Sequence, residues 1–218
     1  MASKSPTEGG RPLFIALAVS LIRLFVGFSL SIALGATLGV LMWRFKSLDE
    51  FFGPLFLGLQ TLPSVCWVPL AIIAFGINES GVLFVVVMGS FFAIAIALRD
   101  GLRQIPPIYQ RAGAMLGTSG WKMYRYVLLP ASLPAMASSL RQGFSFAWRS
   151  LMGAEFVFTA VRHHGLGFLL DTGRNFSDVP QVIAVMIIMV LLGMAADRLA
   201  FGVLERSVHR RFGLSVAE

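Results

Sequence analysis

Polar and charged side chains stand within one of the most apolar stretches of this sequence. The polar positions of interest in residues 127–160 are Arg141, Gln142, Ser145, Arg149 and Glu155. A charge at the centre of a membrane costs at least about 2.5–3.5 kcal/mol, so it normally faces protein or water. At about 100° per residue, Gln142, Ser145 and Arg149 share one face of a helix, while Arg141 and Glu155 share another. These side chains are candidates for contact with a charged solute.

Two interpretations of this segment are open. In the first, Arg149 and Gln142 help an anion across, because a guanidinium group forms two parallel hydrogen bonds with a planar oxyanion. In the second, Arg149 and Glu155 are paired structural charges between helices. Arg141 is nearer the end of the segment, and we expect it to extend its charge to the membrane interface.

A proline-rich segment at 51–76 is a second candidate for the lining of a pathway. Its notable residues are Pro54, Pro63, Pro69, Thr61 and Ser64. Proline removes a backbone donor and clashes with the preceding turn, so one straight helix cannot hold all three prolines. A broken helix at membrane depth is tolerated where it faces protein or a water-filled cavity. The segment is therefore either a pathway lining that exposes Thr61 and Ser64 or a kinked packing helix.

Other kinds of chemistry find no support in the sequence. The single cysteine, Cys66, cannot form an internal disulfide, and the adjacent His163 and His164 have no third ligand at metal spacing. Neither a nucleophile with a base nor a catalytic pair of carboxylates is evident, so we do not expect an enzyme. The loop GxxxxGK[ST] is absent from the sequence, which argues against ATP binding by that motif. No soluble basic domain suggests a nucleic acid partner.

The composition predicts the membrane helices that would position these residues. The chain has 218 residues, of which 56% are hydrophobic and 13% charged, whereas soluble domains carry about 25% charged residues. Because about 20 apolar residues cross the hydrocarbon core as a helix, we predict an all-α polytopic membrane helical bundle. It has about five transmembrane helices, at 13–43, 51–76, 81–98, 127–160 and 179–201. The first contains Gly35 and Gly39, a GxxxG pair that allows close approach of another helix.

The predicted organisation is one membrane domain with short ends. A flexible lead-in at 1–12 precedes a single domain at 13–206, and residues 207–218 form a tail. Most Lys and Arg residues outside the spans lie on the side that holds the 99–126 loop and the C-terminus. Since cytoplasmic loops carry an excess of Lys and Arg, this loop and the C-terminus are expected in the cytoplasm.

The predicted cytoplasmic loop leads into a basic stretch with three glycines, RAGAMLGTSGWKMYRYVLLP. Pro106 and Pro107 break the preceding helix, Gly117 can end the next one, and Thr118 or Ser119 can cap another. We therefore expect a short helix, a turn and a second helix that re-enters the membrane.

One face of that short helix would carry Gly113 and Gly117, which are four residues apart. Their small size would let the surface of another protein approach closely. The alternative is an amphipathic helix that rests on anionic lipid.

The spacing in this stretch resembles the EAA loop of the membrane subunits of ATP-binding-cassette importers. That loop runs Glu-Ala-Ala, three residues, Gly, nine residues, Ile, one residue and Leu-Pro. The matching positions are Arg111, Ala112, Gly113, Gly117, Val127, Leu129 and Pro130. The resemblance implies a contact with an ATPase through these positions other than Val127, together with Thr118 and Ser119. Arg111 replaces the usual acid and Gly113 the second alanine, so the charge at this contact should differ from the usual one.

Four further stretches, in order along about residues 20–212, resemble the nitrate, sulfonate, taurine and bicarbonate branch of these importers. They are SLIRLFVGFSLSIALGATLGVLM, LQTLPSVCWVPLAIIAFGINES, SSLRQGFSFAWRSLMGAEF and GLGFLLDTGRNFSDVPQVIAVMIIMVLLGMAADRL. The resemblance implies a type I permease subunit in a bacterial cytoplasmic membrane. Such a subunit would move a small anionic solute by alternating access.

The resemblance also implies the partners of the chain. Two copies of a soluble ATPase would bind ATP and Mg and dock near residues 108–118. A second copy of the permease would complete the pathway, and an external binding protein would deliver the solute. The chain would work in the lipid bilayer, hold no cofactor and bind no nucleic acid. The alternative function is an ion-coupled secondary transporter or channel without an ATPase, because broken helices and buried charges also occur there.

Overall fold

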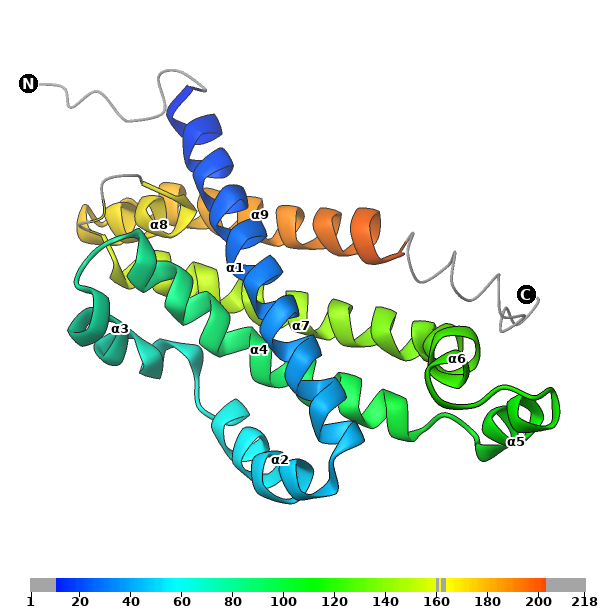
Figure 1. Cartoon of the computed structure of the whole chain (residues 1–218). Coiled ribbons are helices and arrows are strands. Elements are labelled where there is room, and N and C mark those ends of the chain that lie inside the picture. The colour runs from blue at the N-terminus through cyan, green and yellow to red at the C-terminus, as the bar shows by residue number, and fades with distance from the viewer. Residues whose placement is uncertain (1–10, 160, 162–163, 203–218) are drawn as a thin grey trace, which may run out of the picture. The chain divides into compact units, whose positions relative to one another are not determined.

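Helices make up the regular secondary structure of the described part of the chain (Figure 1). A computed structural model describes residues 11–159, 161 and 164–202. The elements are α1 (Arg11–Arg44), α2 (Lys46–Gln60), η1 (Ser64–Trp67), α3 (Val68–Phe75), α4 (Glu79–Arg103), α5 (Pro107–Met115), α6 (Gly120–Met123), η2 (Tyr124–Leu128), α7 (Leu129–Val157), α8 (Leu166–Asn175), α9 (Val179–Ala196) and η3 (Asp197–Phe201). The predicted all-α fold is confirmed. Residues 1–10 of the predicted lead-in, His163 and the predicted tail at 207–218 lie outside the described residues.

The chain divides into two compact units. Unit 1 comprises the residues up to Ser31, Leu62–Ser90 and Ser145–Ala195, and unit 2 comprises Ile32–Thr61, Phe91–Phe144 and the residues from Ala196 onward. The helices α1, α4 and α7 each contribute one part to each unit. The single domain predicted at 13–206 stays a prediction.

A row of small residues on α1 packs against α4. Cβ atoms added to Gly35 and Gly39 would lie 2.8 and 2.7 Å from backbone carbonyl oxygens of α4. Ser90 Oγ, on α4, donates to Ser31 Oγ at 2.7 Å. The close approach predicted from Gly35 and Gly39 is therefore real, and it extends back along α1 through Ser31 to Gly27.

The helices α1 and α4 run in the same direction. Arg23 pairs with Glu79 at the start of α4, whereas Gly39 lies against Ala95 in its second half. If both helices cross a membrane, the chain between them must return to the side from which it started. The segment between α1 and α4 contains α2 and the pair η1 and α3. Together these helices are apolar and long enough to cross a membrane as a broken span. The parallel packing thus favours a crossing over a re-entrant loop.

Prolines explain the break between α2 and η1. Pro54 lies inside α2, Pro63 precedes η1, and Pro69 stands in the first turn of α3, where a missing backbone donor costs little. One straight helix does not form, as the sequence predicts.

Apolar composition alone identifies fewer spans than the five predicted. Three described stretches are long and apolar enough by themselves, namely Leu13–Arg44, Glu79–Arg103 and Val179–Leu199, and the bent pair makes up to four. The predicted span at 127–160 is not among them, and α7 carries Ser, Pro and Gln residues as well as Arg141, Arg149 and Glu155.

Packing shows why α7 nevertheless follows α4 along its length. Cβ atoms added to Gly101 and Gly89 would meet Ala135 and Ser150, and one on Gly81 would lie 2.7 Å from the Phe158 ring. As the residue numbers on α4 decrease from 101 to 81, the residue numbers of their partners on α7 and just beyond its end increase from 135 to 158. The helix α7 therefore runs antiparallel to α4. Its buried polar residues, which include Ser150 and Glu155, are accommodated by helix contacts rather than by lipid.

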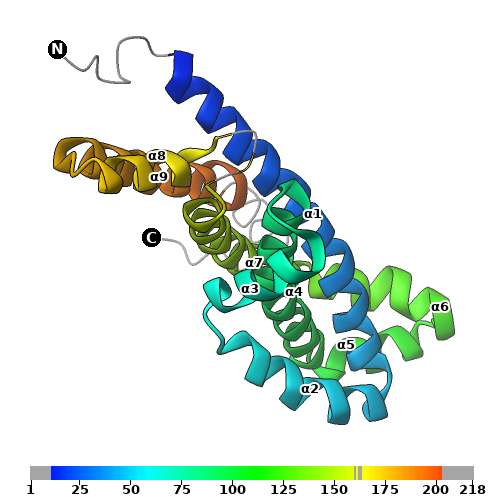
Figure 2. The ribbon, with the colours of Figure 1, turned by 90° about the vertical axis from the view of Figure 1, so that its left-hand side faces the viewer.

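The C-terminal helices of unit 1, α8 and α9, form a hairpin (Figures 1 and 2). Gln181 Nε2 donates to the carbonyl oxygen of Leu169 at 3.0 Å. The apolar side chains of α9 are largely exposed, including Ile187 and Val190. In a span such a surface suits lipid or a neighbouring membrane helix.

Candidate functional site

The exposed polar positions of α7 form the first part of the candidate site. Gln142, Ser145 and Arg149 are all exposed, and we call them the α7 stripe. Arg149 Nε donates to the carbonyl oxygen of Ser145 at 3.1 Å, and its guanidinium carbon lies 4.7 Å from the centre of the Phe146 ring. No carboxylate within the described ranges pairs with Arg149. Its guanidinium group is therefore exposed and has no counter-charge among these residues.

The helix break lies against α7 next to this stripe. A Cβ atom added to Gly153 would lie 3.1 Å from Val65 Cγ2, and one added to Gly89 would lie 3.2 Å from Ser64 Cβ. Gly153 is one turn from Arg149, so η1 packs close to the stripe within unit 1. Ser64 is half-buried at this contact, while Val65 remains exposed.

Thr61, the other predicted polar residue of the break, belongs to unit 2. It is exposed, and its Oγ1 donates to the carbonyl oxygen of Gly58 at 2.6 Å. The hydroxyl is therefore used within the last turn of α2, where it satisfies a backbone carbonyl group. Ser64 alone of the two is placed against α7.

Glu155 is not part of the exposed stripe. Its side chain is almost wholly buried, and its Oε1 accepts from Arg23 NH1 at 2.8 Å. Ser20 Oγ lies 2.7 Å from Glu155 Oε2. Glu155 is thus a structural charge paired between helices, whereas Arg149 lies on a different face of α7, because six residues of helix separate the two side chains.

Arg23 connects two carboxylates on different helices. Its Nε and NH2 donate to the two oxygens of Glu79, each at 2.7 Å, while NH1 reaches Glu155. We call Ser20, Arg23, Glu79 and Glu155 the Arg23 cluster. It joins α1, the start of α4 and the end of α7. In the sequence, Arg23 stands alone within an apolar segment, and the signal that it takes part in a site is that a lone arginine in such a segment requires a partner.

The Arg23 cluster also caps the N-terminus of α8. The Leu166 backbone N–H donates to Ser20 Oγ at 3.0 Å, and that of Gly167 donates to Glu155 Oε2 at 3.1 Å. A carboxylate at this end complements the helix dipole as well as the unpaired donors. Side chains at Gly165 or Gly167 would overlap Glu155. Because Gly165 and Gly167 have no side chains, the backbone at the start of α8 can approach this carboxylate closely.

Arg141 also has a carboxylate partner. Its Nε and NH2 donate to the two oxygens of Asp197 in η3 at 2.8 and 2.7 Å. A bidentate pair of this kind is more directional than an arginine that only extends to the interface. No local sequence pattern connects these two residues, because they are 56 positions apart.

A second ionic cluster lies in unit 2. Asp49 accepts from Arg99 NH1 at 3.1 Å and from Arg103 NH2 at 2.6 Å. Arg99 also pairs with Asp100 at 2.8 Å. We call Asp49, Arg99, Asp100 and Arg103 the Asp49 cluster. It joins the first turn of α2 to the last turns of α4.

The predicted coupling segment forms a helix, a turn and a second short helix. Gly117 follows α5 with a φ of 77°, a left-handed conformation that suits glycine. The N–H of Thr118 donates to the Gly113 carbonyl and that of Gly117 to the Ala114 carbonyl, both at 3.0 Å. This pair of bonds is the Schellman arrangement at a helix C-terminus. Gly117 thus ends α5 as the sequence indicates.

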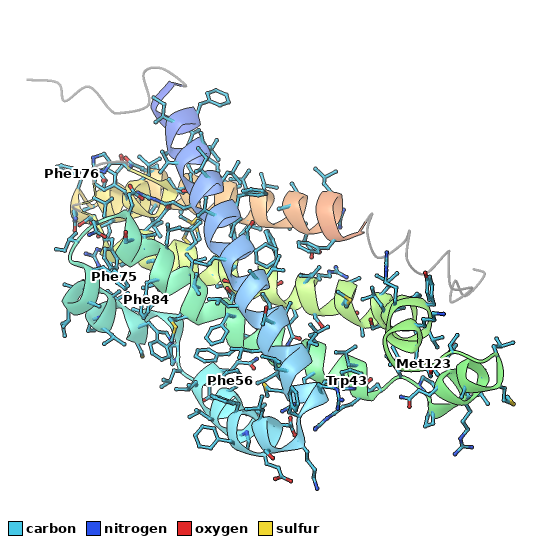
Figure 3. The ribbon with its side chains drawn as sticks, viewed as in Figure 1. Trp43, Phe56, Phe75, Phe84, Met123 and Phe176 are labelled. Carbon is cyan, nitrogen blue, oxygen red and sulfur yellow. The ribbon has the colours of Figure 1, made fainter. Side chains whose placement is uncertain are left out.

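The two glycines of this segment differ in exposure. Gly113 is buried, and a Cβ atom there would lie 2.8 Å from Met123 Sδ and 2.9 Å from Thr118 Oγ1. Met123 fills this turn from the inside (Figure 3). Gly117 is exposed, with no atom near its Cβ position. Of the pair, Gly117 alone offers its surface to another protein.

The remaining coupling positions surround the turn. Arg111 and Ser119 are exposed, and Ala112 is half-buried. Leu129 begins α7 with Pro130 as its second residue. Beside them is a hollow of about 450 Å³, lined by residues that include Tyr109, Tyr126 and Pro130.

In the part of the chain that the structure describes, no three His, Cys, Asp or Glu side chains are placed to hold a metal ion. The geometry instead combines an exposed arginine stripe, a broken helix and a projecting helical turn, in an all-helical chain with apolar spans. These are features of a polytopic membrane protein.

Residues 31–210 match the model of the family described as binding-protein-dependent transport system inner membrane component. The chain therefore belongs to this family, that of the permease subunits of ATP-binding-cassette importers.

Curated relatives specify the branch. The chain is 33% identical to the putative ABC transporter permease protein MJ0413 of Methanocaldococcus jannaschii, over 83% of this chain and 67% of that protein. It is 31% identical to the bicarbonate transport system permease protein CmpB of Synechococcus elongatus, over 85% and 66% of the two chains. It is 30% identical to the nitrate import permease protein NrtB of a Synechocystis strain, with the same coverage. The match spans about two thirds of the length of these relatives.

The fold is also similar to that of a solved transporter. A chain in an inward-facing structure of the MetNI methionine ABC transporter superposes with a TM-score of 0.73 at 20% identity, covering 95% of this chain and 99% of that chain. This likeness concerns the fold.

Proposed function

We propose that this chain is the membrane-spanning permease of an ATP-driven importer for a small anion of the nitrate, sulfonate, taurine or bicarbonate class. The observation that carries the proposal is the exposed Arg149, which has no carboxylate partner among the described residues. Relatives named as bicarbonate and nitrate permeases support the anionic class. The chain would reside in a cytoplasmic membrane with its C-terminus inside.

In this proposal the α7 stripe and the helix break line the pathway. The Arg149 guanidinium would bind a planar oxyanion through two parallel hydrogen bonds, and Gln142 and Ser145 would add neutral donors along the same helix face. Ser64 and Thr61 would contribute hydroxyl groups from the break. Glu155 would act by holding α7 against α1 and α8, since its oxygens are already occupied.

Transport would be driven from the coupling segment. Two ATPase subunits would bind ATP and Mg and dock at α5 and the exposed turn at Gly117, with Arg111 in the contact. Their movement would tilt α7 through Leu129 and Pro130 and so alternate the access of the pathway. A second permease copy would complete the pathway, and an external binding protein would deliver the anion.

The test is uptake by proteoliposomes that contain the permease, its ATPase and its binding protein. We expect ATP-dependent uptake of labelled bicarbonate or nitrate, and we expect Arg149→Gln to lower it about tenfold, as loss of a charge-assisted hydrogen bond implies. Arg198→Gln removes an exposed charge elsewhere and serves as the matched control. Wild-type rate and affinity in Arg149→Gln would exclude the anion role. Uptake that continues without any ATPase would identify a channel or secondary transporter instead.

A further inference from the structure

The helix α5 and the turn after it expose most of their surface. Of the nine residues of α5, Gly113 alone is buried. Ile108, Met115 and Leu116 are 62%, 81% and 83% exposed. A helix of this length is marginally stable in water by itself, and large apolar side chains exposed together mark a surface that another molecule covers. We call Ile108, Arg111, Met115 and Leu116 the α5 tip.

The charged residues around the α5 tip are all basic. Between Asp100 and Glu155 the sequence contains no acidic residue. Arg111, Lys122 and Arg125 are exposed, and none of the three has a carboxylate partner among the described residues. Because exposed charges of one sign add to a common potential, this segment attracts an acidic surface and repels a basic one.

The position of Arg111 favours a protein over a lipid bilayer as the molecule that covers the α5 tip. At about 100° per residue, Ile108, Arg111 and Met115 share one face of α5. A helix that lies on a bilayer keeps its basic residues on the polar face, opposite the apolar face. Here the charge lies within the apolar face, so burial of this face requires a carboxylate next to an apolar pocket. A protein surface provides this combination, whereas acyl chains do not.

A hollow between α5, η2 and α7 lies next to the α5 tip within unit 2. Its volume is about 450 Å³, and its lining includes the rings of Pro106, Tyr109, Tyr126, Pro130 and Pro134. Tyr109 and Tyr126 are 50% and 71% exposed. Aromatic rings that line a concave surface suit an apolar side chain of a partner protein. The hollow therefore adds a second apolar contact to the same surface.

We propose that the α5 tip docks into an acidic cleft of the partner ATPase. A carboxylate of the ATPase pairs with Arg111, an apolar pocket of the ATPase receives Met115 and Leu116, and an apolar side chain of the ATPase enters the hollow. This inference rests on the proposed function and specifies the chemistry of the partner. An ATPase with a basic docking cleft does not fit this chain.

Binding of the purified ATPase to the permease in phosphatidylcholine nanodiscs tests the charge of the contact. We expect Arg111→Glu to weaken binding about tenfold at low salt, because like charges then face each other. The difference from the wild type should shrink at high salt. Arg44→Glu reverses an exposed charge outside the coupling segment and serves as the matched control, with unchanged binding.

A second variant tests the apolar part of the contact. Leu116 is almost fully exposed, so Leu116→Ser leaves the packing of the permease intact, and we expect it to weaken binding at low and high salt alike. Wild-type affinity in Arg111→Glu or in Leu116→Ser would overturn the inference and leave the proposed function standing. If the wild-type permease does not bind the ATPase at all, the proposed function itself is contradicted.

A single fluorescent label distinguishes the ATPase from lipid at the α5 tip. Cys66 is the only cysteine of the chain, so a Met115→Cys variant in a Cys66→Ser background takes an environment-sensitive dye at the tip alone. We expect a blue shift of the dye emission when the ATPase is added, and none when phosphatidylglycerol replaces phosphatidylcholine. A blue shift in phosphatidylglycerol without the ATPase would show that anionic lipid covers the tip, and it would overturn the proposal.

Discussion

The Arg23 cluster and the Asp49 cluster both join helices through ion pairs, but their charge arrangements are opposite. In unit 1, one arginine connects two carboxylates, and the central pair of Arg23 and Glu155 is almost wholly buried. In unit 2, one carboxylate connects two arginines, and Arg103 is 47% exposed. The Asp49 cluster consists of two arginines and two aspartates, whereas the Arg23 cluster consists of one arginine, two glutamates and a serine.

This difference indicates where the chain depends on ionic contacts. Loss of one partner from a buried pair leaves an uncompensated charge with no access to water. At the Asp49 cluster, water and a neighbouring acid can compensate for a lost partner. We therefore expect the stability of unit 1 to depend more steeply on its central residue than that of unit 2.

The largest effect is expected for Arg23→Gln. It leaves Glu155 buried beside Ser20 without a cation, so the free energy of unfolding should fall by about 3 kcal/mol, at the lower end of the range for a broken buried pair. The measurement is denaturant unfolding in detergent, followed by circular dichroism.

A double variant checks the cause of this loss. Adding Glu155→Gln removes the unpaired charge, and we expect it to restore part of the lost stability. If the double variant is less stable than Arg23→Gln by the full cost of a second lesion, the two residues do not act as a pair.

An intermediate effect is expected when a methyl group is added at a glycine beside each cluster. In Gly167→Ala the new Cβ would lie 2.5 Å from Glu155 Cβ and 2.7 Å from the Phe156 backbone nitrogen, so we expect a loss of about 2 kcal/mol from overpacking. In Gly53→Ala the nearest atom, at 2.7 Å, is NH1 of the Arg99 side chain, which can move. We expect Gly53→Ala to be nearly neutral, since alanine also favours the helix by about 0.5–1 kcal/mol. Thermal unfolding of the two variants measures the difference, and equal losses would refute the proposed rigidity of the α8 cap.

The smallest effect is expected for Asp49→Asn. Arg99 keeps Asp100 as a partner and Arg103 is open to water, so the loss should be about 1.5 kcal/mol, as for a hydrogen bond to a charged group. Asp49 and Arg99 are 13% and 9% exposed, so only the contribution of Arg103, which is 47% exposed, should shrink when unfolding is measured at high salt. A loss equal to that of Arg23→Gln at every salt concentration would contradict the contrast between the two clusters.

Several parts of the fold and site follow from local sequence patterns. The prolines of residues 51–76 predict the broken helix, Gly117 predicts the end of α5, and the spacing of Gly35 and Gly39 predicts close helix packing. Each depends on the backbone preferences of one residue or on helix periodicity. The face shared by Gln142, Ser145 and Arg149 is likewise a matter of periodicity, and all three are exposed in the structure.

The pairing of charges could not be predicted in the same way. Arg23 and Glu155 are 132 positions apart, and Arg141 and Asp197 are 56 apart. Periodicity orients a side chain around its own helix but does not say which helix lies opposite. The sequence of residues 127–160 therefore leaves the partner of Glu155 open, and the packing of α1 provides Arg23. The burial of Gly113 could not be predicted for a similar reason, because Met123, which covers it, follows the turn and lies ten residues further along the chain.

By itself, the sequence determined that this protein is an all-helical membrane permease with a break in its second apolar segment and a helical turn before α7. These properties depend on composition, proline and glycine chemistry, and motif spacing, all of which are local. Tertiary structure alone decided that Glu155 is enclosed by Arg23, Ser20 and the N-terminus of α8, and that Arg149 stays exposed. The physical reason is that a charge in an apolar chain must find its counter-charge in space, and helix packing determines which one it meets.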